Sequence, residues 1–139
     1  MFIFNLYAKE HMKRYFIIWV LSSKVFMSNL YLRFLRIARA LNQNKTTMKT
    51  VDATTMLLLN EIAIQHFDGK DLTVTEAMNL SQIASPATIH RKLDELRELG
   101  FIEQIFEGAN RRTKFLVPTK LANAYFEKMS EAMTNAVNY

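Results

Sequence analysis

The sequence predicts a mostly α-helical protein with one small antiparallel β-hairpin. Half of the 139 residues are hydrophobic, and only three are Gly and two are Pro, a composition typical of a compact helical domain. Apolar residues recur at three- and four-residue intervals through most of the chain, as on the buried face of a helix. Residues 101–117 differ, because two β-prone runs flank a turn there. The length suits one domain with a core of its own.

The net charge of +5 is unevenly distributed along the chain. Residues 1–48 hold eight Lys or Arg against one acid, whereas residues 49–139 hold ten against twelve. A basic region is either a solvated face or a surface that attracts a polyanion, such as nucleic acid or anionic lipid. Charge alone does not decide between these interpretations.

The amino-terminal part contains a strongly apolar run, YFIIWVL at residues 15–21, which follows Lys13 and Arg14. The run falls well short of the roughly 20 residues that span a bilayer, and no A-x-A cleavage site follows it. We therefore expect no membrane partner and a buried or dimer-facing helix, with a membrane-surface anchor as the alternative. A natural start at Met27, with this run as upstream sequence, is a further alternative.

Two helices are predicted before the first turn. One spans residues 29–41, and the other runs from Asp52 to about His66. A turn at residues 67–71 follows, where Gly69 can take a positive φ. The predicted buried residues are Leu30, Phe34, Ile37, Ala38 and Leu41 in the first helix and Met56, Leu59, Ile62 and Ala63 in the second.

Capping signals define two more helices. Thr73 and Glu76 fit a capping box, in which each side chain accepts a hydrogen bond from the backbone N–H of the other residue. Ser85 is the predicted cap of the next helix, Pro86 lies in its first turn and Gly100 ends it. The predicted buried stripe of this helix is Ile89, Leu93, Leu96 and Leu99.

Two short helices joined by a tight turn form a helix-turn-helix. The hairpin that follows has strands at residues 101–106 and 113–117, around a turn with Gly108 and Asn110. From Thr119 a last helix is predicted, with Ala122, Phe126, Met129 and Met133 buried. The fold class is therefore a winged helix-turn-helix domain with flanking dimerisation helices, mostly α with a small antiparallel β-wing. The predicted division is into 1–48 (amino-terminal apolar and basic helices), 49–118 (the winged helix-turn-helix) and 119–139 (a carboxy-terminal helix).

The helix that follows Ser85 has the features needed to enter the major groove of DNA, because its inner face is apolar and its outer face is polar. The 100° step between residues places Ala87, Thr88, Arg91 and Glu95 outward and His90 and Lys92 on the flanks. The helix N-terminus favours a phosphate, and the hairpin brings Arg111 and Arg112 near a minor groove or the backbone. In the alternative interpretation these two arginines belong to a solvated turn. The predicted DNA-binding residues are Ser85, Ala87, Thr88, His90, Arg91, Lys92, Arg111, Arg112 and Lys114.

Over residues 30–129 the chain resembles the MarR family of winged-helix transcriptional regulators. LTVTEAM at residues 72–78 stands where that family typically has LTVSELA. The recognition-helix pattern S-x-x-T-[VI]-x-R-x-[LV]-D-x-L is met over residues 85–96. The wing signature Asp-x-Arg is matched by Asn110 and Arg112, with Asn110 in place of the acid that normally steadies the wing.

The resemblance implies a DNA-binding homodimer. It implies that Arg112 is a minor-groove arginine and that Ala87, Thr88, His90 and Arg91 read the major groove. In that family a ligand pocket lies between the dimer helices and the DNA-binding lobe, which leaves a small-molecule effector open. The chain ends at Tyr139, before the long carboxy-terminal helix that builds most dimers of the family. We therefore expect the amino-terminal apolar segment to take that role.

Motifs for catalysis and metal binding are missing from the sequence. It contains no cysteine, no phosphate-cradling glycine loop, no H-E-x-x-H and no nucleophile elbow. His11 and His66 lack acidic or cysteine partners at ligand spacing. We therefore expect no enzyme activity, no cofactor and no metal, and the absence of cysteine fits a reducing cytoplasm.

The function expected from the sequence is that of a sequence-specific double-stranded DNA-binding transcriptional regulator. It would be a homodimeric repressor that reads the major groove with helix 85–99 and the minor groove or backbone with the wing at 101–117. Two alternatives stay open: a winged-helix protein–protein interaction module, which the acidic balance after residue 49 favours, and a replication initiator or other mobile-element DNA-binding protein.

Overall fold

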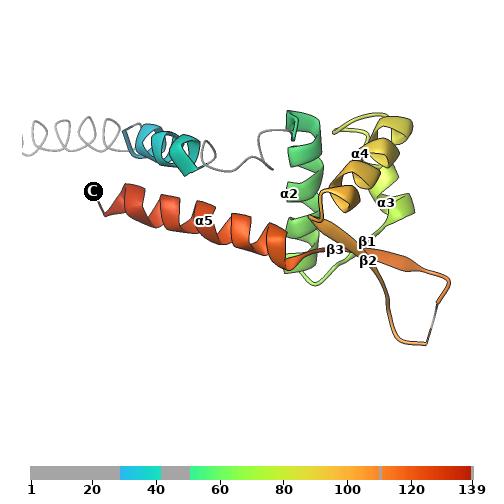
Figure 1. Cartoon of the computed structure of the whole chain (residues 1–139). Coiled ribbons are helices and arrows are strands. Elements are labelled where there is room, and N and C mark those ends of the chain that lie inside the picture. The colour runs from blue at the N-terminus through green and yellow to red at the C-terminus, as the bar shows by residue number, and fades with distance from the viewer. Residues whose placement is uncertain (1–28, 42–50, 110, 139) are drawn as a thin grey trace, which may run out of the picture. The chain divides into compact units, whose positions relative to one another are not determined.

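The computed structural model describes residues 29–41, 51–109 and 111–138 (Figure 1). The chain divides into two compact units, one of residues 42–130 and one of residues 1–41 with 131–139. The predicted apolar helix around residues 15–21 and the break after residue 41 lie outside the described residues, and the predicted division into three segments stays a prediction.

The larger unit has the element order of a winged helix-turn-helix, as the sequence predicts. A helix precedes a very short strand, two helices follow, and a β-hairpin leads into a last helix (Figure 1). The elements are α2 (Ala53–Phe67), β1 (Leu72–Thr73), α3 (Val74–Met78), α4 (Pro86–Glu98), β2 (Ile102–Phe106), β3 (Lys114–Pro118) and α5 (Lys120–Val137).

The sheet has three antiparallel strands in the order β1-β3-β2. The predicted hairpin is confirmed, with Ile102 opposite Pro118 and Phe106 opposite Lys114. The strand β1, whose Leu72 pairs with Leu116, is not predicted from the sequence. A strand of two residues is too short to show the alternation that identifies strands in a sequence.

The predicted helix starts are confirmed by their capping contacts. The backbone N–H of Thr73 donates to Glu76 Oε2 (2.8 Å), and the backbone N–H of Glu76 donates to Thr73 Oγ1 (3.2 Å), which completes the capping box. At the start of α2 the backbone N–H of Thr55 donates to Asp52 Oδ1 (2.8 Å). Each cap satisfies backbone donors that the helix itself leaves unpaired.

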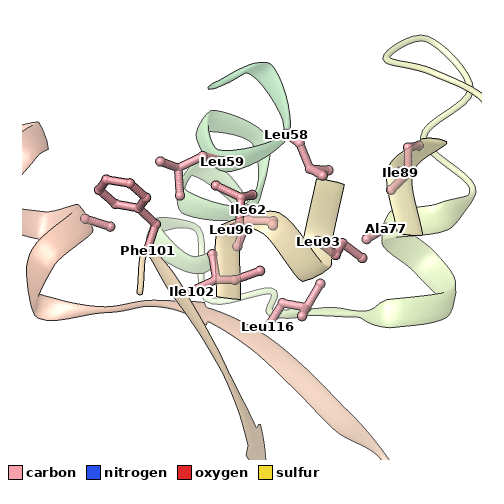
Figure 2. Packing of buried hydrophobic residues seen from close by; sticks show 11 residues of the cluster. Leu58, Leu59, Ile62, Ala77, Ile89, Leu93, Leu96, Phe101, Ile102 and Leu116 are labelled. Atoms are coloured by element: carbon pink, nitrogen blue, oxygen red, sulfur yellow. The ribbon is translucent and has the colours of Figure 1, made fainter. Parts of the chain in front are cut away.

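One hydrophobic core fills the space between α2, α4 and the sheet (Figure 2). Its buried members are Leu58, Leu59, Ile62, Ala77, Ile89, Leu93, Leu96, Phe101, Ile102, Leu116 and Ala122. The α4 stripe is confirmed except for Leu99, which is half-buried.

The buried face of α2 differs from the predicted one. It is formed by Thr55, Leu58, Leu59 and Ile62, whereas the predicted Met56 and Ala63 are only half-buried. Apolar residues surround much of this helix, so its own pattern does not define one face. The position of α4 and the sheet selects the buried face.

The smaller unit contains the helix over residues 29–41 and the end of α5. Ala38, Ala132 and Ala136 are buried there, but Met133, predicted to be buried, is 57% exposed. Small alanine side chains let helices approach closely, and Met133 follows Ala132 by a 100° turn of the helix. Six apolar side chains line a pocket of about 250 Å³, namely Leu30, Tyr31, Phe34, Met133, Ala136 and Val137. Across the described parts of the chain, no helix is both long enough and apolar enough to cross a membrane.

Candidate nucleic-acid interface

The helix α4 is held by its apolar face and presents a polar face to solvent. Ile89, Leu93 and Leu96 are buried in the core. On the opposite side, Ala87, His90 and Arg91 are exposed, and Thr88 is half-buried. The exposure of Ala87, His90 and Arg91 agrees with the helix periodicity, whereas Thr88 is less exposed than predicted. Contact of these residues with DNA stays a prediction.

The first turn of α4 is small and polar. Ser85 is the N-cap, and its hydroxyl accepts a hydrogen bond from the backbone N–H of Thr88 (3.4 Å). The two hydroxyl groups of Ser85 and Thr88 also lie 2.9 Å apart, at hydrogen-bond distance. Pro86 occupies the first helical turn, where it has no N–H to leave unpaired. Such a turn lets another molecule approach the helix closely, and the positive end of the helix dipole there attracts negatively charged groups.

Two basic residues on the outer face of α4 pair with the same carboxylate, that of Asp94. His90 Nδ1 lies 3.3 Å from Asp94 Oδ2, and Arg97 donates to Asp94 Oδ1 at 3.2 Å. Both pairs are exposed, and such pairs are worth little in stability. Among the described residues Arg91 forms no ion pair. Its guanidinium group is therefore available to an external acceptor.

Lys92 is not on the outer flank, where the sequence analysis puts it. The residue is only 9% exposed, and its ammonium group binds Asp52 and Glu95, with 2.7 Å to Glu95 Oε2. Lys92 follows Ile89 by three residues and precedes Leu96 by four, so it lies beside the buried stripe. Its long stem covers apolar surface while the charged end reaches the edge of the core.

The charges around Lys92 reinforce one another. The hydrogen bond from Lys92 is the main cause that holds the pKa of the Asp52 carboxyl well below its ordinary value. The same bond, followed by that to Glu95, raises the pKa of Lys92. Asp52 and Lys92 are therefore both charged around neutral pH. Glu95, which was expected to point outward, is half-buried and belongs to this cluster.

The wing carries the remaining candidates. Arg111 and Arg112 lie exposed in the turn between β2 and β3, and Gly108 takes a φ of +60° there. Lys114 is exposed on β3, with its Nζ 5.8 Å from the centre of the Phe106 ring. Residue 110, the expected partner of the wing signature, is outside the described residues.

Hydrogen bonds fix the base of the wing to the end of α4. The hydroxyl of Thr119 donates to the carbonyl oxygen of Gly100, and its backbone N–H donates to the carbonyl oxygen of Phe101 (3.0 Å). Gly100 has a φ of +78°, which suits the sharp turn out of the helix. The two ends of the hairpin therefore meet beside the last turn of α4.

Asp52 and Thr55 also belong to this region, and no sequence motif predicts that they do. Asp52 could be recognised as a helix cap, but no spacing connects it with Lys92, because the two residues are distant in the sequence. Among the described residues no cluster of three or more His, Cys, Asp or Glu could hold a metal ion. His66, for which the sequence predicts no acidic partner at ligand spacing, has its Nδ1 2.6 Å from Asp71 Oδ1.

Comparisons with known proteins identify the fold. No protein-family model matches the chain, and no curated protein matches its sequence. The transcriptional regulator Tm0710 from Thermotoga maritima aligns with a TM-score of 0.55 and 19% identity, covering 88% of this chain and 75% of that one. A MarR-like transcriptional regulator from the same organism, tm0816, gives a TM-score of 0.58 and 13% identity, covering 85% of this chain and 77% of its own. At these identities the likeness is one of fold, and the chain has the winged-helix fold of MarR-like transcriptional regulators.

Proposed function

We propose that this protein is a sequence-specific double-stranded DNA-binding transcriptional regulator that acts as a repressor. The observation that carries the proposal is the two-sided character of α4, whose apolar face is buried while its polar face is open to solvent. A helix reads the major groove when a rigid scaffold presents such a face. The fold shared with solved transcriptional regulators supports the same function.

The candidate residues have distinct roles in this proposal. Arg91, exposed at the centre of the polar face, would donate to a base edge, as arginine does to the O6 and N7 atoms of guanine. Ser85 and Thr88, at the helix start, would lie near a phosphate. Arg111 and Arg112 would contact the minor groove or the backbone from the wing.

The proposal includes a homodimer. Six apolar side chains of the smaller unit line an open pocket, and three of them, Tyr31, Met133 and Val137, are more than half exposed. A second copy of the chain would cover such a surface in a two-fold symmetric contact. Two recognition helices related by that symmetry would read the two halves of a palindromic site. A regulator of this kind would act in the cytoplasm.

The proposal is tested by two dissociation constants measured at one fixed salt concentration. One is for a duplex that the wild-type protein selects from a random-sequence pool, and the other is for a scrambled duplex. We expect Arg91→Ala to lower the preference for the selected duplex by about 1–3 kcal/mol, the worth of one good base contact. The melting temperature should hardly change, because exposed substitutions change stability by within about 0.5 kcal/mol.

Arg97→Ala is the matched control. It removes the same positive charge from the exposed side of the same helix. Within the described part of the chain Arg97, unlike Arg91, forms an ion pair with Asp94. We expect its preference to stay close to that of the wild type. A wild-type protein without any preference for a selected duplex would exclude the sequence-reading function.

A second candidate function is a winged-helix protein-interaction module. The observation in its favour is a stripe of exposed apolar residues on α2: Leu57, Ile64 and Phe67 are all more than half exposed, and Phe67 is 91% exposed. The acidic balance of residues 49–139 points the same way. This candidate predicts that the protein binds DNA only weakly and electrostatically, with an affinity that falls as salt increases and with no preference for any sequence.

A further inference from the structure

Four residues form a closed ring of hydrogen bonds between the start of α2, with its N-cap, and the middle of α4. Lys92 Nζ donates to Asp52 and to Glu95 Oε2, which lies 2.7 Å away. Glu95 Oε2 also accepts from Thr55 Oγ1 (3.5 Å), and Asp52 Oδ1 accepts from the backbone N–H of Thr55 (2.8 Å). Each of the four residues therefore contacts two others, and each helix contributes two members.

The lysine is an unusual choice for its position. Its neighbours Ile89, Leu93 and Leu96 are buried and apolar, and a side chain of similar length such as methionine would continue that face. The carboxylates that bind it remain in contact with solvent, with side-chain exposures of 52% for Asp52 and 32% for Glu95, and ion pairs open to solvent add little to stability. Stability alone therefore does not account for Lys92.

The ring adds a directional constraint to the packing of α4 against α2. Apolar contacts between α2 and α4 are non-directional, so they tolerate a small rotation or slide of one helix on the other. An ammonium group between two carboxylates has a fixed position, because hydrogen bonds weaken steeply away from their preferred distance and angle. The ring therefore fixes the rotation of α4 about its own axis.

That rotation matters for the outer face. Arg91 precedes Lys92 directly, so any turn of the helix that moves one moves the other. A base contact is made only within about 2.7–3.2 Å between donor and acceptor. A shift of a fraction of that distance at Arg91 would weaken the contact without removing any group that touches DNA.

From these contacts we propose that Lys92, clamped by Asp52 and Glu95, is a positioning residue that sets the orientation of α4 for reading DNA. The inference rests on the proposed function and deepens it, because it assigns sequence discrimination in part to three residues that touch no base. It also replaces the direct DNA contact that the sequence analysis expects of Lys92.

Charge changes of opposite sign separate the clamp from a direct contact. Lys92→Met removes a positive charge, whereas Asp52→Asn removes a negative one and keeps a good helix cap. Direct electrostatics predicts weaker DNA binding for the first variant and tighter binding for the second. The clamp predicts the same outcome for both, a loss of the preference for the selected duplex over the scrambled one. We expect that loss to be on the order of tenfold, similar to the worth of a good base contact.

The controls use the same helix and the same assay. Glu98→Gln removes one negative charge from the exposed end of α4, outside the ring, and should leave the preference unchanged. The double variant Lys92→Met with Asp52→Asn should lose little more than either single variant, because both changes open the same ring. The melting temperature of each variant shows whether the fold is kept. If Lys92→Met does not fold, Asp52→Asn and Glu95→Gln test the clamp in its place.

The outcomes distinguish the two levels of the proposal. Equal loss of preference in Lys92→Met and Asp52→Asn, with melting temperatures held, supports the clamp. A wild-type preference that both variants keep overturns the clamp and leaves the proposed function standing. Weaker binding to every duplex in Lys92→Met, with tighter binding in Asp52→Asn, overturns it in favour of a direct phosphate contact. A wild type with no preference overturns the proposed function, and the clamp falls with it.

Discussion

Lys114 lies opposite Phe106 across the wing, with its ammonium nitrogen 5.8 Å from the centre of the ring. A cation over an aromatic face is attracted by the electron density of the ring. The contact keeps the ammonium group close to the strands of the hairpin. Arg111 and Arg112 lie farther along the hairpin, exposed in the turn at its tip.

The difference in position between the tip and the strand predicts unequal contributions to electrostatic DNA binding. Arg112→Ala should weaken binding to every duplex and reduce the slope of log K against log salt by about 0.9, the value for one phosphate contact. Lys114→Ala should reduce the slope by less. Titrations of one random duplex at several salt concentrations measure both slopes. Equal slopes in Arg112→Ala and the wild type would remove the wing tip from the interface.

A dimer formed by the smaller unit should be sensitive to charge at its apolar pocket. Met133→Asp places a carboxylate among the apolar side chains that line the pocket, and an unpaired charge is costly to bury in an interface. We expect monomers in sedimentation velocity at concentrations where the wild type is dimeric. Asn135→Asp, which makes the same charge change at an exposed residue outside the pocket, is the control and should stay dimeric.

The capping box of α3 predicts a loss of stability in acid. Hydrogen bonds from the backbone and the hydroxyl of Thr73 hold the pKa of Glu76 below its ordinary value of 4.5. Because the folded pKa is the lower one, the contribution of Glu76 is complete above the unfolded pKa. It is lost as the pH falls through the folded pKa.

Glu76→Gln tests this directly, because glutamine can still accept the capping hydrogen bonds but does not titrate in this range. Chemical unfolding of both proteins between pH 7 and about pH 3 gives the free energy of unfolding. We expect the wild-type advantage over the variant to shrink as the pH falls below about 4.5. An advantage that stays constant with pH would show that the pKa of Glu76 is the same in both states.

Two leucines of α4 should differ in their contribution to stability. Leu96 is fully buried in the core, whereas Leu99 is half-buried. Leu96→Ala should cost about 2–5 kcal/mol in the free energy of unfolding, since it removes buried methyl groups and leaves a cavity. Leu99→Ala should cost clearly less, because solvent already reaches part of that side chain. Denaturant unfolding of the two variants measures the difference, and equal costs would contradict the burial assigned to Leu99.

The elements of the winged helix were predictable from the sequence where their signals are local. The caps at Thr73 and Ser85 lie within one turn of the groups they bind, and Gly100 ends α4 through its own backbone conformation. A sequence shows such relationships directly, because donor and acceptor are three residues apart.

Long-range contacts account for what the sequence did not show. The pairing of β1 with β3 depends on residues that lie on either side of the whole helix-turn-helix. The burial of Lys92 depends on Asp52, which caps a different helix. For the candidate site, periodicity was sufficient to predict the exposure of His90 and Arg91, but it could not tell a basic residue held by another helix from one open to solvent.

The pairing of Leu72 with Leu116 also constrains the order in which the protein can fold. The hairpin of β2 and β3 closes only a short loop, but β1 can join it only when the ends of a segment that contains α3, α4 and β2 come together. Closing that segment has an entropic cost that is recovered only by the contacts formed inside it. We therefore expect the pairing of β1 with β3 and the packing of α4 into the core to form together in one late step of folding. A nascent chain would then place the exposed polar face of α4 only after β3 has left the ribosome.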